Sequence, residues 1–195
     1  VMVTHAPDQR RSYAGLGYLV LEHLCEQLTG RRFGDWMDER ILGPMGMTAS
    51  TFDLDPNLGL PLACGHDGRG QVLAGRRELC PWSAAAGLYS TAPDLAIYCR
   101  MILGQGEYHG ARIYDAETIH QATIRQTPKG VDEDRGLGFD VYEVAPYITD
   151  LNREPGKHVV VGHFGYTGTM IWMDQLTRSW FVLLTNRTWP AKDGA

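Results

Sequence analysis

The sequence has little of several features that mark particular classes of protein. Its 195 residues contain no apolar run near the roughly 18 residues that a membrane-spanning helix needs. The first residues, Val-Met-Val-Thr-His-Ala, have neither the basic start nor the apolar stretch of a secretory signal peptide. Basic residues number 18 against 23 acidic ones and form no block, which argues against a nucleic-acid-binding surface. Length and a hydrophobic content of 44% predict a soluble globular protein of one domain or little more.

Patterns that bind zinc or nucleotides are also absent from the sequence. The four cysteines form no Cys-x-x-Cys pair, the seven histidines include no His-Glu-x-x-His, and there is no phosphate-binding loop. We therefore expect neither a metal ion nor a cofactor. Cys25 and Cys99 fall on predicted helix faces, where a thiol packs as a small hydrophobe. Cys64 and Cys80 lie in loop-like sequence, where a disulfide and a reduced pair both remain open.

Helical periodicity dominates the first part of the chain. Apolar residues at helical spacing predict four helices, over residues 16–28, 33–42, 91–102 and about 115–125. Gly30 is predicted to end the first helix and Gly43-Pro44 the second. Residues 91–94 (Thr-Ala-Pro-Asp) read as a capping box for the third. Residues 48–90 are rich in Gly, Pro and Asp and predict a long loop, a kind of segment that often carries function.

Alternation with a period of two replaces helical spacing in the last third of the chain. It predicts strands over residues 138–144, 159–163, 169–174 and 180–185. The last three are close enough in sequence to form an antiparallel meander. Helices followed by a sheet indicate an α+β fold, and not alternating βαβ units.

Three stretches in this order carry a known family pattern. They are residues 13–18 (Tyr-Ala-Gly-Leu-Gly-Tyr) with 41–47 (Ile-Leu-Gly-Pro-Met-Gly-Met), residues 86–95 (Ala-Gly-Leu-Tyr-Ser-Thr-Ala-Pro-Asp-Leu), and residues 162–168 (Gly-His-Phe-Gly-Tyr-Thr-Gly). Together they resemble the serine β-lactamase and penicillin-binding-protein-like family, in the branch of class C β-lactamases, D-Ala-D-Ala carboxypeptidases and related esterases. The stretches correspond to its Tyr-Ser-Asn segment, its Gly-Gly-Leu-x-Ser-Thr-x-x-Asp-Leu stretch and its Lys-Thr-Gly strand.

The resemblance implies a β-lactamase/transpeptidase-like fold that is incomplete in this chain. Residues 1–195 would form one partial domain, mainly helix and loop over 1–135 and antiparallel strands over 136–190. The family's nucleophile motif, Ser-x-x-Lys, lies upstream of the tyrosine segment in the family and occurs nowhere in this sequence. We therefore expect the N-terminal part of the fold to be missing and this chain alone to be inactive. The compartment, periplasmic or cytoplasmic, stays open.

The resemblance also assigns candidate site residues. Tyr13 would be the general base, and His163 would replace the lysine of the third motif as a donor on the substrate-binding strand. The backbone N–H of Tyr166, just after Gly165, would form half of an oxyanion hole. Local sequence alone would also allow Tyr13 to be an aromatic anchor at a helix start and His163 a residue at a strand end. Gly15 stands where the family has Asn, and together with His163 this favours peptidase-like or esterase-like relatives.

Two functions follow from the resemblance. The chain is part of a serine hydrolase that transfers the acyl group of a D-amino peptide, a β-lactam or a small ester, or it is a non-catalytic binding or assembly module of the same descent. The first is favoured because the pocket-lining motifs are largely intact. The expected partner is a small-molecule or peptide substrate, with no nucleic acid and no membrane span. The exposed edge of an incomplete sheet predicts either self-association or poor solubility in isolation.

Overall fold

The computed structural model describes part of the chain, and that part divides into two compact units. The described residues are 6, 8–10, 12–53, 62–63, 66, 71, 84–131, 134–143 and 159–186. Unit 1 comprises Val1–Tyr13, Tyr98–His163 and Met170–Phe181, and unit 2 comprises Ala14–Ile97, Phe164–Thr169 and Val182–Ala195. The open question of a Cys64–Cys80 disulfide lies outside the described residues.

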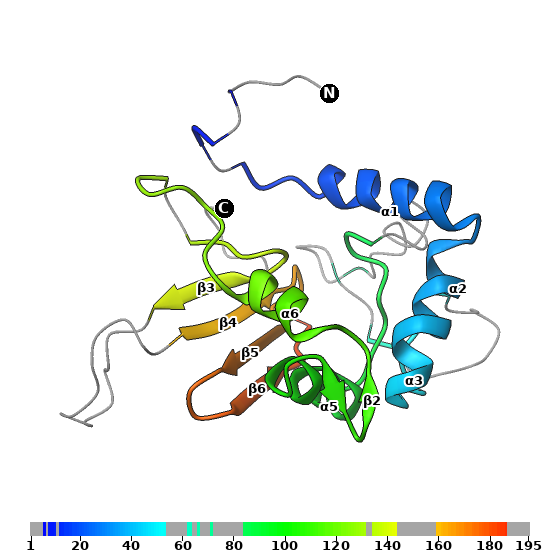
Figure 1. The fold of residues 1–195 in the computed structure, drawn as a ribbon. Helices are drawn as coiled ribbons and strands as arrows, with labels where there is room; N and C mark the ends of the chain where they lie inside the picture. The colour runs from blue at the N-terminus through cyan, green and yellow to red at the C-terminus, as the bar shows by residue number, and fades with distance from the viewer. Residues whose placement is uncertain are drawn as a thin grey trace. The chain divides into compact units, whose positions relative to one another are not determined.

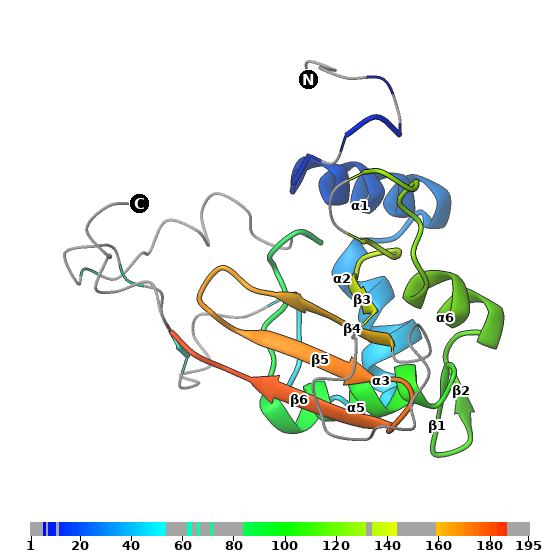
Figure 2. The same ribbon diagram turned by 90° about the vertical axis from the view of Figure 1, so that its left-hand side faces the viewer.

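A four-stranded sheet makes up much of unit 1 (Figure 1). Its strands are β3 (Asp140–Glu143), β4 (Val159–Phe164), β5 (Met170–Asp174) and β6 (Ser179–Leu183). They are adjacent in that order (Figure 2), and β3 pairs with β4 antiparallel, with Val141 opposite Val161. All four predicted strands are therefore confirmed, each bound lying within two residues of the prediction. The α+β class is confirmed with them.

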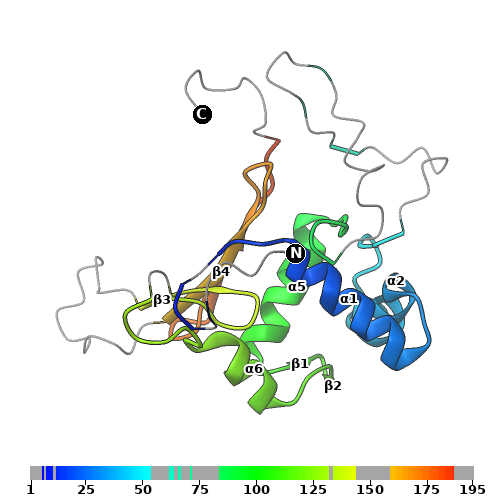
Figure 3. The same cartoon turned by 90° about the horizontal axis from the view of Figure 1, so that it is seen from above.

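One face of the sheet carries the core of unit 1. Val161 and Met173 are fully buried and Val141 is nearly so, whereas Tyr142, whose side chain points to the opposite face, is half-exposed. Helix α6 (Ala116–Thr123) and the C-terminal half of α5 (Ala92–Leu103) lie on one face of the sheet (Figure 3). These helices bury a further apolar set, Cys99, Met101, Ile102, Leu103 and Ile119. Burial of large apolar side chains, at about 1.5–3 kcal/mol each, stabilises this unit.

The short elements between α5 and the sheet differ in how well they follow from sequence. Helix α6 begins as predicted, because the carboxylate of Asp115 accepts a hydrogen bond from the N–H of Thr118 at 2.6 Å. The hairpin of β1 (Glu107–Tyr108) and β2 (Ala111–Arg112) was not predicted. Its turn residues His109 and Gly110 have φ of 47° and 82°, the two positive values of a type I′ turn. Histidine is an unusual first residue for that turn, so the local signal is weak.

Helix α1 (Leu16–Thr29) opens unit 2 and ends, as predicted, at Gly30, whose φ of 67° terminates the helix. No residue of α1 is buried. Its apolar residues are instead largely exposed, including Val20, Leu21, Leu24 and Leu28. Periodicity therefore predicts the helix correctly, although most of its large apolar residues stay exposed. Within the part of the chain that the structure describes, none of the helices combines the length and the apolarity needed to span a bilayer.

The second helical segment of unit 2 ends later in the chain than the sequence predicts. It runs as α2 (Phe33–Met37), the π-helical η1 (Asp38–Leu42) and α3 (Gly43–Met45). The prediction that Gly43-Pro44 ends the helix was wrong, and the end comes at Gly46, with φ of 73°. Pro44 lies in the first turn of α3, which follows the wider π-helical turn of η1 without a break. Apolar residues of this segment and of the stretch 47–52 that follows it form the core of unit 2, namely Ile41, Leu42, Met45, Met47 and Phe52.

The start of α5 departs from a complete capping box. The hydroxyl oxygen of Thr91 accepts a hydrogen bond from the N–H of Asp94 at 3.4 Å, as the capping box requires. The carboxylate of Asp94 does not return the bond, since it accepts from the N–H of Ala49 and the hydroxyl of Ser50 instead. The helix itself is confirmed and ends at Leu103, one residue beyond the prediction.

Candidate active site

The structure brings together Tyr13 and His163, which are 150 positions apart in the sequence. Both belong to unit 1. Their ring centroids are 6.4 Å apart and the ring planes are inclined by 31°. That separation falls within the range of about 4.5–7 Å in which aromatic rings contact each other. Tyr13 is 75% exposed and His163 is half-buried, so the pair is open to solvent on the tyrosine side.

Strand β4 positions His163. The last residue of β4 paired with β3 is Gly162, opposite Asp140, so His163 lies just beyond the β3–β4 ladder. Because side chains alternate along a strand, His163 shares a face with buried Val161. On the other face, a Cβ added at Gly162 would lie 2.1 Å from the carbonyl oxygen of Ile171 and 2.5 Å from the ring of Trp172. The glycine thus lets β5 pack closely against the strand that presents His163.

The backbone at the start of α1 follows directly after Tyr13. Gly15 occupies the N-cap position with a helical backbone and no side chain to accept a hydrogen bond. The first turn is closed by main-chain bonds instead, from the N–H of Gly17 to the carbonyl of Ala14 at 3.2 Å and from the N–H of Tyr18 to the carbonyl of Gly15 at 3.0 Å. Tyr13 therefore stands two residues before the N-cap, on the segment that leads into the helix.

Gly165 and Tyr166 lie in the turn between β4 and β5, which belongs to unit 2. The N–H of Gly165 donates to the carbonyl of Thr169 at 2.7 Å, and a Cβ at Gly165 would lie 2.0 Å from the hydroxyl oxygen of Thr169. The hydroxyl of Thr185 donates to the carbonyl of Thr167 at 2.8 Å. Sequence reasoning missed Thr169 and Thr185 as residues that hold this turn. The ring of Tyr166 is 65% exposed.

Burial makes three weakly acidic groups of unit 1 unsuited to act as a base near neutral pH. Burial raises the pKa of the Cys99 thiol to about 12. Burial also raises the pKa of the hydroxyl groups of Tyr98 and Tyr114 above the usual range for tyrosine. All three therefore stay protonated. No group of three or more potential metal ligands occurs among the residues that the structure describes.

Comparison with known proteins gives the family. The chain belongs to the Beta-lactamase family, whose model matches residues 2–195. An Escherichia coli K12 protein, provisionally named a D-alanyl-D-alanine carboxypeptidase, is 25% identical over 210 residues, covering 94% of this chain and 46% of that protein. A beta-lactamase from Mycobacterium bovis is 25% identical with a TM-score of 0.63, covering 94% of this chain and 59% of the other.

The solved structures also confirm the fold class. An octameric penicillin-binding protein homologue from Pyrococcus abyssi is 23% identical with a TM-score of 0.71, covering 94% of this chain and 40% of the other. The expected β-lactamase/transpeptidase-like fold is thereby confirmed. The chain spans about half the length of the curated relatives it matches.

Proposed function

We propose that this chain supplies the general base and the substrate-binding strand of a serine acyl hydrolase whose substrate is a D-amino peptide, a β-lactam or a small ester. The observation that carries the proposal is the contact between Tyr13 and His163, at 6.4 Å between ring centroids. The relative from Escherichia coli, named for D-alanyl-D-alanine carboxypeptidase activity, supports the substrate class.

In the proposed reaction, Tyr13 acts on a serine hydroxyl. The phenolate of Tyr13, or its oxygen through a proton shared with a lysine, takes the proton as the serine oxygen bonds to the acyl carbon. The N–H of Tyr166 stabilises the oxyanion and His163 donates to the bound substrate. The proton then passes to the leaving nitrogen or oxygen as its bond to the acyl carbon breaks, and water hydrolyses the acyl-serine. A positioned base contributes about 10²–10⁴-fold to such a rate.

The nucleophile of this reaction is proposed to come from outside these 195 residues, because the sequence contains no Ser-x-x-Lys. A segment encoded before Val1 or a second chain would supply it. The first check is the coding sequence upstream of Val1, in which we expect a Ser-x-x-Lys. A contiguous upstream sequence without one would contradict supply in cis.

The role of Tyr13 is tested on the gene product that carries both the serine and this chain. We expect Tyr13→Phe to slow acylation by fluorescent penicillin or a fluorophosphonate about 100-fold or more, with the Kd for non-covalent binding little changed. Tyr18→Phe on α1 is the matched control and should keep the rate. An unchanged acylation rate in Tyr13→Phe would overturn the assignment.

The alternative function is a non-catalytic binding or assembly module. The absence of Ser-x-x-Lys from the chain is the observation that favours it. It predicts that a β-lactam or a peptide stem binds without forming a covalent adduct. Intact-mass measurement after denaturation distinguishes the two functions, since a stoichiometric acyl adduct would exclude the module.

A further inference from the structure

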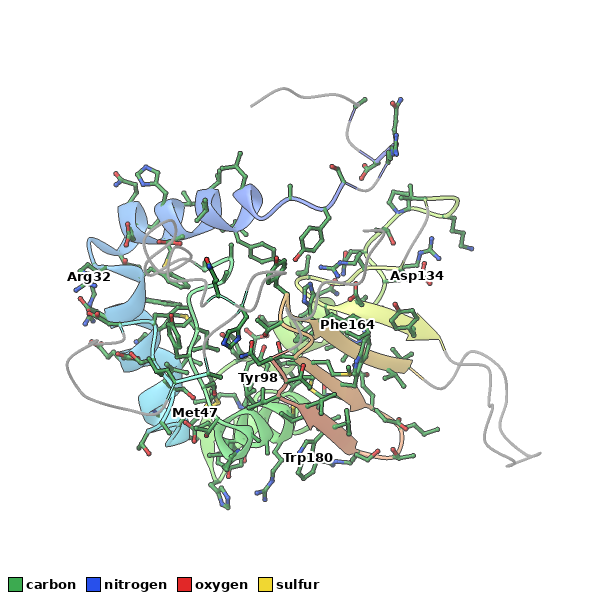
Figure 4. The ribbon with its side chains drawn as sticks, turned by 180° about the vertical axis from the view of Figure 1, so that it is seen from behind. Arg32, Met47, Tyr98, Asp134, Phe164 and Trp180 are labelled. Atoms are coloured by element: carbon green, nitrogen blue, oxygen red, sulfur yellow. The ribbon has the colours of Figure 1, made fainter. Side chains whose placement is uncertain are left out.

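Unit 1 contains a cavity whose lining includes neither Tyr13 nor His163. Its volume is about 340 Å³, and it lies between the end of α5, the β1–β2 hairpin and the start of β6. Figure 4 labels Trp180, one of its lining residues, beside α5. Pockets that hold small organic ligands begin at roughly 300 Å³, so the cavity is large enough for one.

The cavity lies at the opposite end of the sheet from His163. The carbonyl of Val159, the first residue of β4, accepts a hydrogen bond from the N–H of Gln175, where the turn that carries Arg178 begins. Val159 and His163 are four residues apart on the strand, a distance of about 13 Å. The cavity is therefore distinct from the proposed catalytic pair.

Two arginines without a carboxylate partner line the cavity. They are Arg100 from α5 and Arg178 from the turn before β6. Among the described residues, neither arginine forms an ion pair. Five other described arginines do, namely Arg31, Arg32, Arg112, Arg125 and Arg135. The guanidinium carbon of Arg100 lies 5.3 Å from the centre of the Tyr108 ring, a cation–π contact that positions the charge without neutralising it.

The acidic residue that lines the cavity does not cancel these charges. Glu107 is held by Arg112 at 2.7 Å, and Arg112 is not part of the lining. The charge of Glu107 is thus already matched from outside, which leaves the two guanidinium groups of the lining in excess. This positive site stands out in a chain whose net charge is −5.

The rest of the lining combines apolar surface with uncommon backbone geometry. Trp180 is 43% exposed and Tyr108 is half-buried, so two aromatic rings border the space. His109 and Arg178 have φ of 47° and 55°, values that non-glycine residues seldom adopt. These values belong to the turns that carry the two residues, the type I′ turn of the β1–β2 hairpin and the turn between β5 and β6.

We propose that this cavity binds a small organic oxyanion, a carboxylate or a phosphate attached to a planar apolar group. Guanidinium groups recognise either anion through paired, charge-assisted hydrogen bonds, and Arg100 and Arg178 supply two such groups. The ring of Trp180 offers a face on which the planar group can stack. This function is independent of acyl transfer and extends beyond it.

The test is titration of the purified chain with phenyl phosphate and, in a second arm, with benzoate, followed through the indole N–H resonance of Trp180. We expect a saturable shift with at least one of them, and the tighter of the two identifies the anionic group. Benzyl alcohol, which has the ring without the charge, should shift the resonance at least tenfold more weakly. No saturable shift with either anion would overturn the proposal.

Variants assign the binding to the two arginines. Arg100→Gln and Arg178→Asn should each weaken binding about tenfold, the effect of losing hydrogen bonds to a charged group. Asn is chosen at residue 178 because it tolerates positive φ. Arg40→Gln removes an exposed arginine of η1 that does not line the cavity and should change the Kd less than twofold. Equal weakening by all three variants would contradict the assignment, and so would unchanged binding in all of them. Circular dichroism melting of each variant checks that it is folded.

Discussion

The carboxylate of Asp94 accepts a hydrogen bond from the hydroxyl of Ser50 at 2.7 Å and another from the N–H of Ala49 at 2.9 Å. Asp94 and Ser50 are only 6% and 8% exposed, so water replaces these bonds poorly. The hydroxyl of Ser90 lies 2.7 Å from that of Ser50 and extends the network. A carboxylate near the start of α5 thus holds two segments of unit 2 that are some 40 residues apart in sequence.

Removal of this carboxylate should destabilise the protein strongly. Asp94→Ala leaves the N–H of Ala49 and the hydroxyl of Ser50 without their acceptor, and we expect a loss of about 3 kcal/mol in the free energy of unfolding. Asp35→Ala, at an exposed position of α2, should cost about 0.5 kcal/mol. Urea denaturation of the two variants measures the difference. Equal losses would show that the Asp94 network contributes little.

Two glycine substitutions should have opposite effects. At Gly162 a Cβ would lie within 2.6 Å of the backbone of Ile171 and the ring of Trp172, so Gly162→Ala should destabilise by about 3 kcal/mol. At Gly17, inside α1, nothing lies within 4 Å of the added carbon. Gly17→Ala should therefore stabilise by up to about 1 kcal/mol through helix propensity. Thermal unfolding gives both signs, and a lower Tm for Gly17→Ala or an unchanged one for Gly162→Ala would contradict the packing described.

The cap of α6 should make part of the stability depend on acid. The hydrogen bond from the N–H of Thr118 lowers the pKa of Asp115 below 3.8, its ordinary value. A carboxyl group whose pKa is depressed on folding contributes stability above its unfolded pKa of about 3.9, and this contribution is lost as the pH falls through the lower folded value. Asp115→Asn caps the helix without titrating. Between about pH 6 and about pH 2, the urea midpoint of this variant should fall less than that of the parent chain, and parallel curves would refute the linkage.

The buried thiol should resist alkylation. Cys99 has no exposed surface, and burial raises its pKa to about 12, so its thiolate is scarce at ordinary pH. Cys25 is half-buried and free. We expect iodoacetamide to modify Cys99 at least about 100-fold more slowly than Cys25 in the native state, as read by peptide mass mapping, and at a similar rate in denaturant. Comparable native rates would mean that α5 opens readily.

Self-association remains a prediction, now with two candidate surfaces. β6 is the last strand in the order of the described sheet and exposes Trp180 and Phe181, whereas α1 exposes Leu21 and Leu28. We expect oligomers by size exclusion with light scattering. Phe181→Lys should dissociate them if the strand edge is responsible, and Leu28→Lys if the helix is. A monodisperse monomer over a range of concentrations would count against both.

Local signals predict the elements of this chain better than they predict its contacts. Alternation and helical spacing place the strands and most helices, because these patterns follow from geometry within a few residues. The sequence does not predict the π-helical turn at 38–42 or the helix end at Gly46. Proline can stand in a first helical turn as well as end a helix, so Pro44 alone does not decide where the segment stops. The sequence does not predict the hydrogen-bond partner of Asp94 for a different reason. An aspartate at this position is equally suited to a capping box and to a bond with a distant serine.

The candidate site shows the same difference between local features, which the sequence predicts, and long-range contacts, which it does not. Nothing in the residues around Tyr13 indicates His163, and only the family resemblance pairs the two. His163 reaches Tyr13 from β4, which pairs with β3 through Val141 opposite Val161 and leaves no room between Gly162 and Trp172. Non-local packing of this kind is not encoded in any window of local sequence.

The 150 positions between Tyr13 and His163 have a consequence for the order of folding. Each doubling of a loop adds only about 0.6 kcal/mol to the entropic cost of closing it, so the length of the loop costs the finished contact little. Its timing is another matter, because a helix such as α1 can form within about a microsecond, whereas we expect the pair to form only after β4 has docked against its neighbours. A probe of the Tyr13–His163 contact would therefore report the completion of the sheet, and chemistry at this pair would be among the last properties to return on refolding.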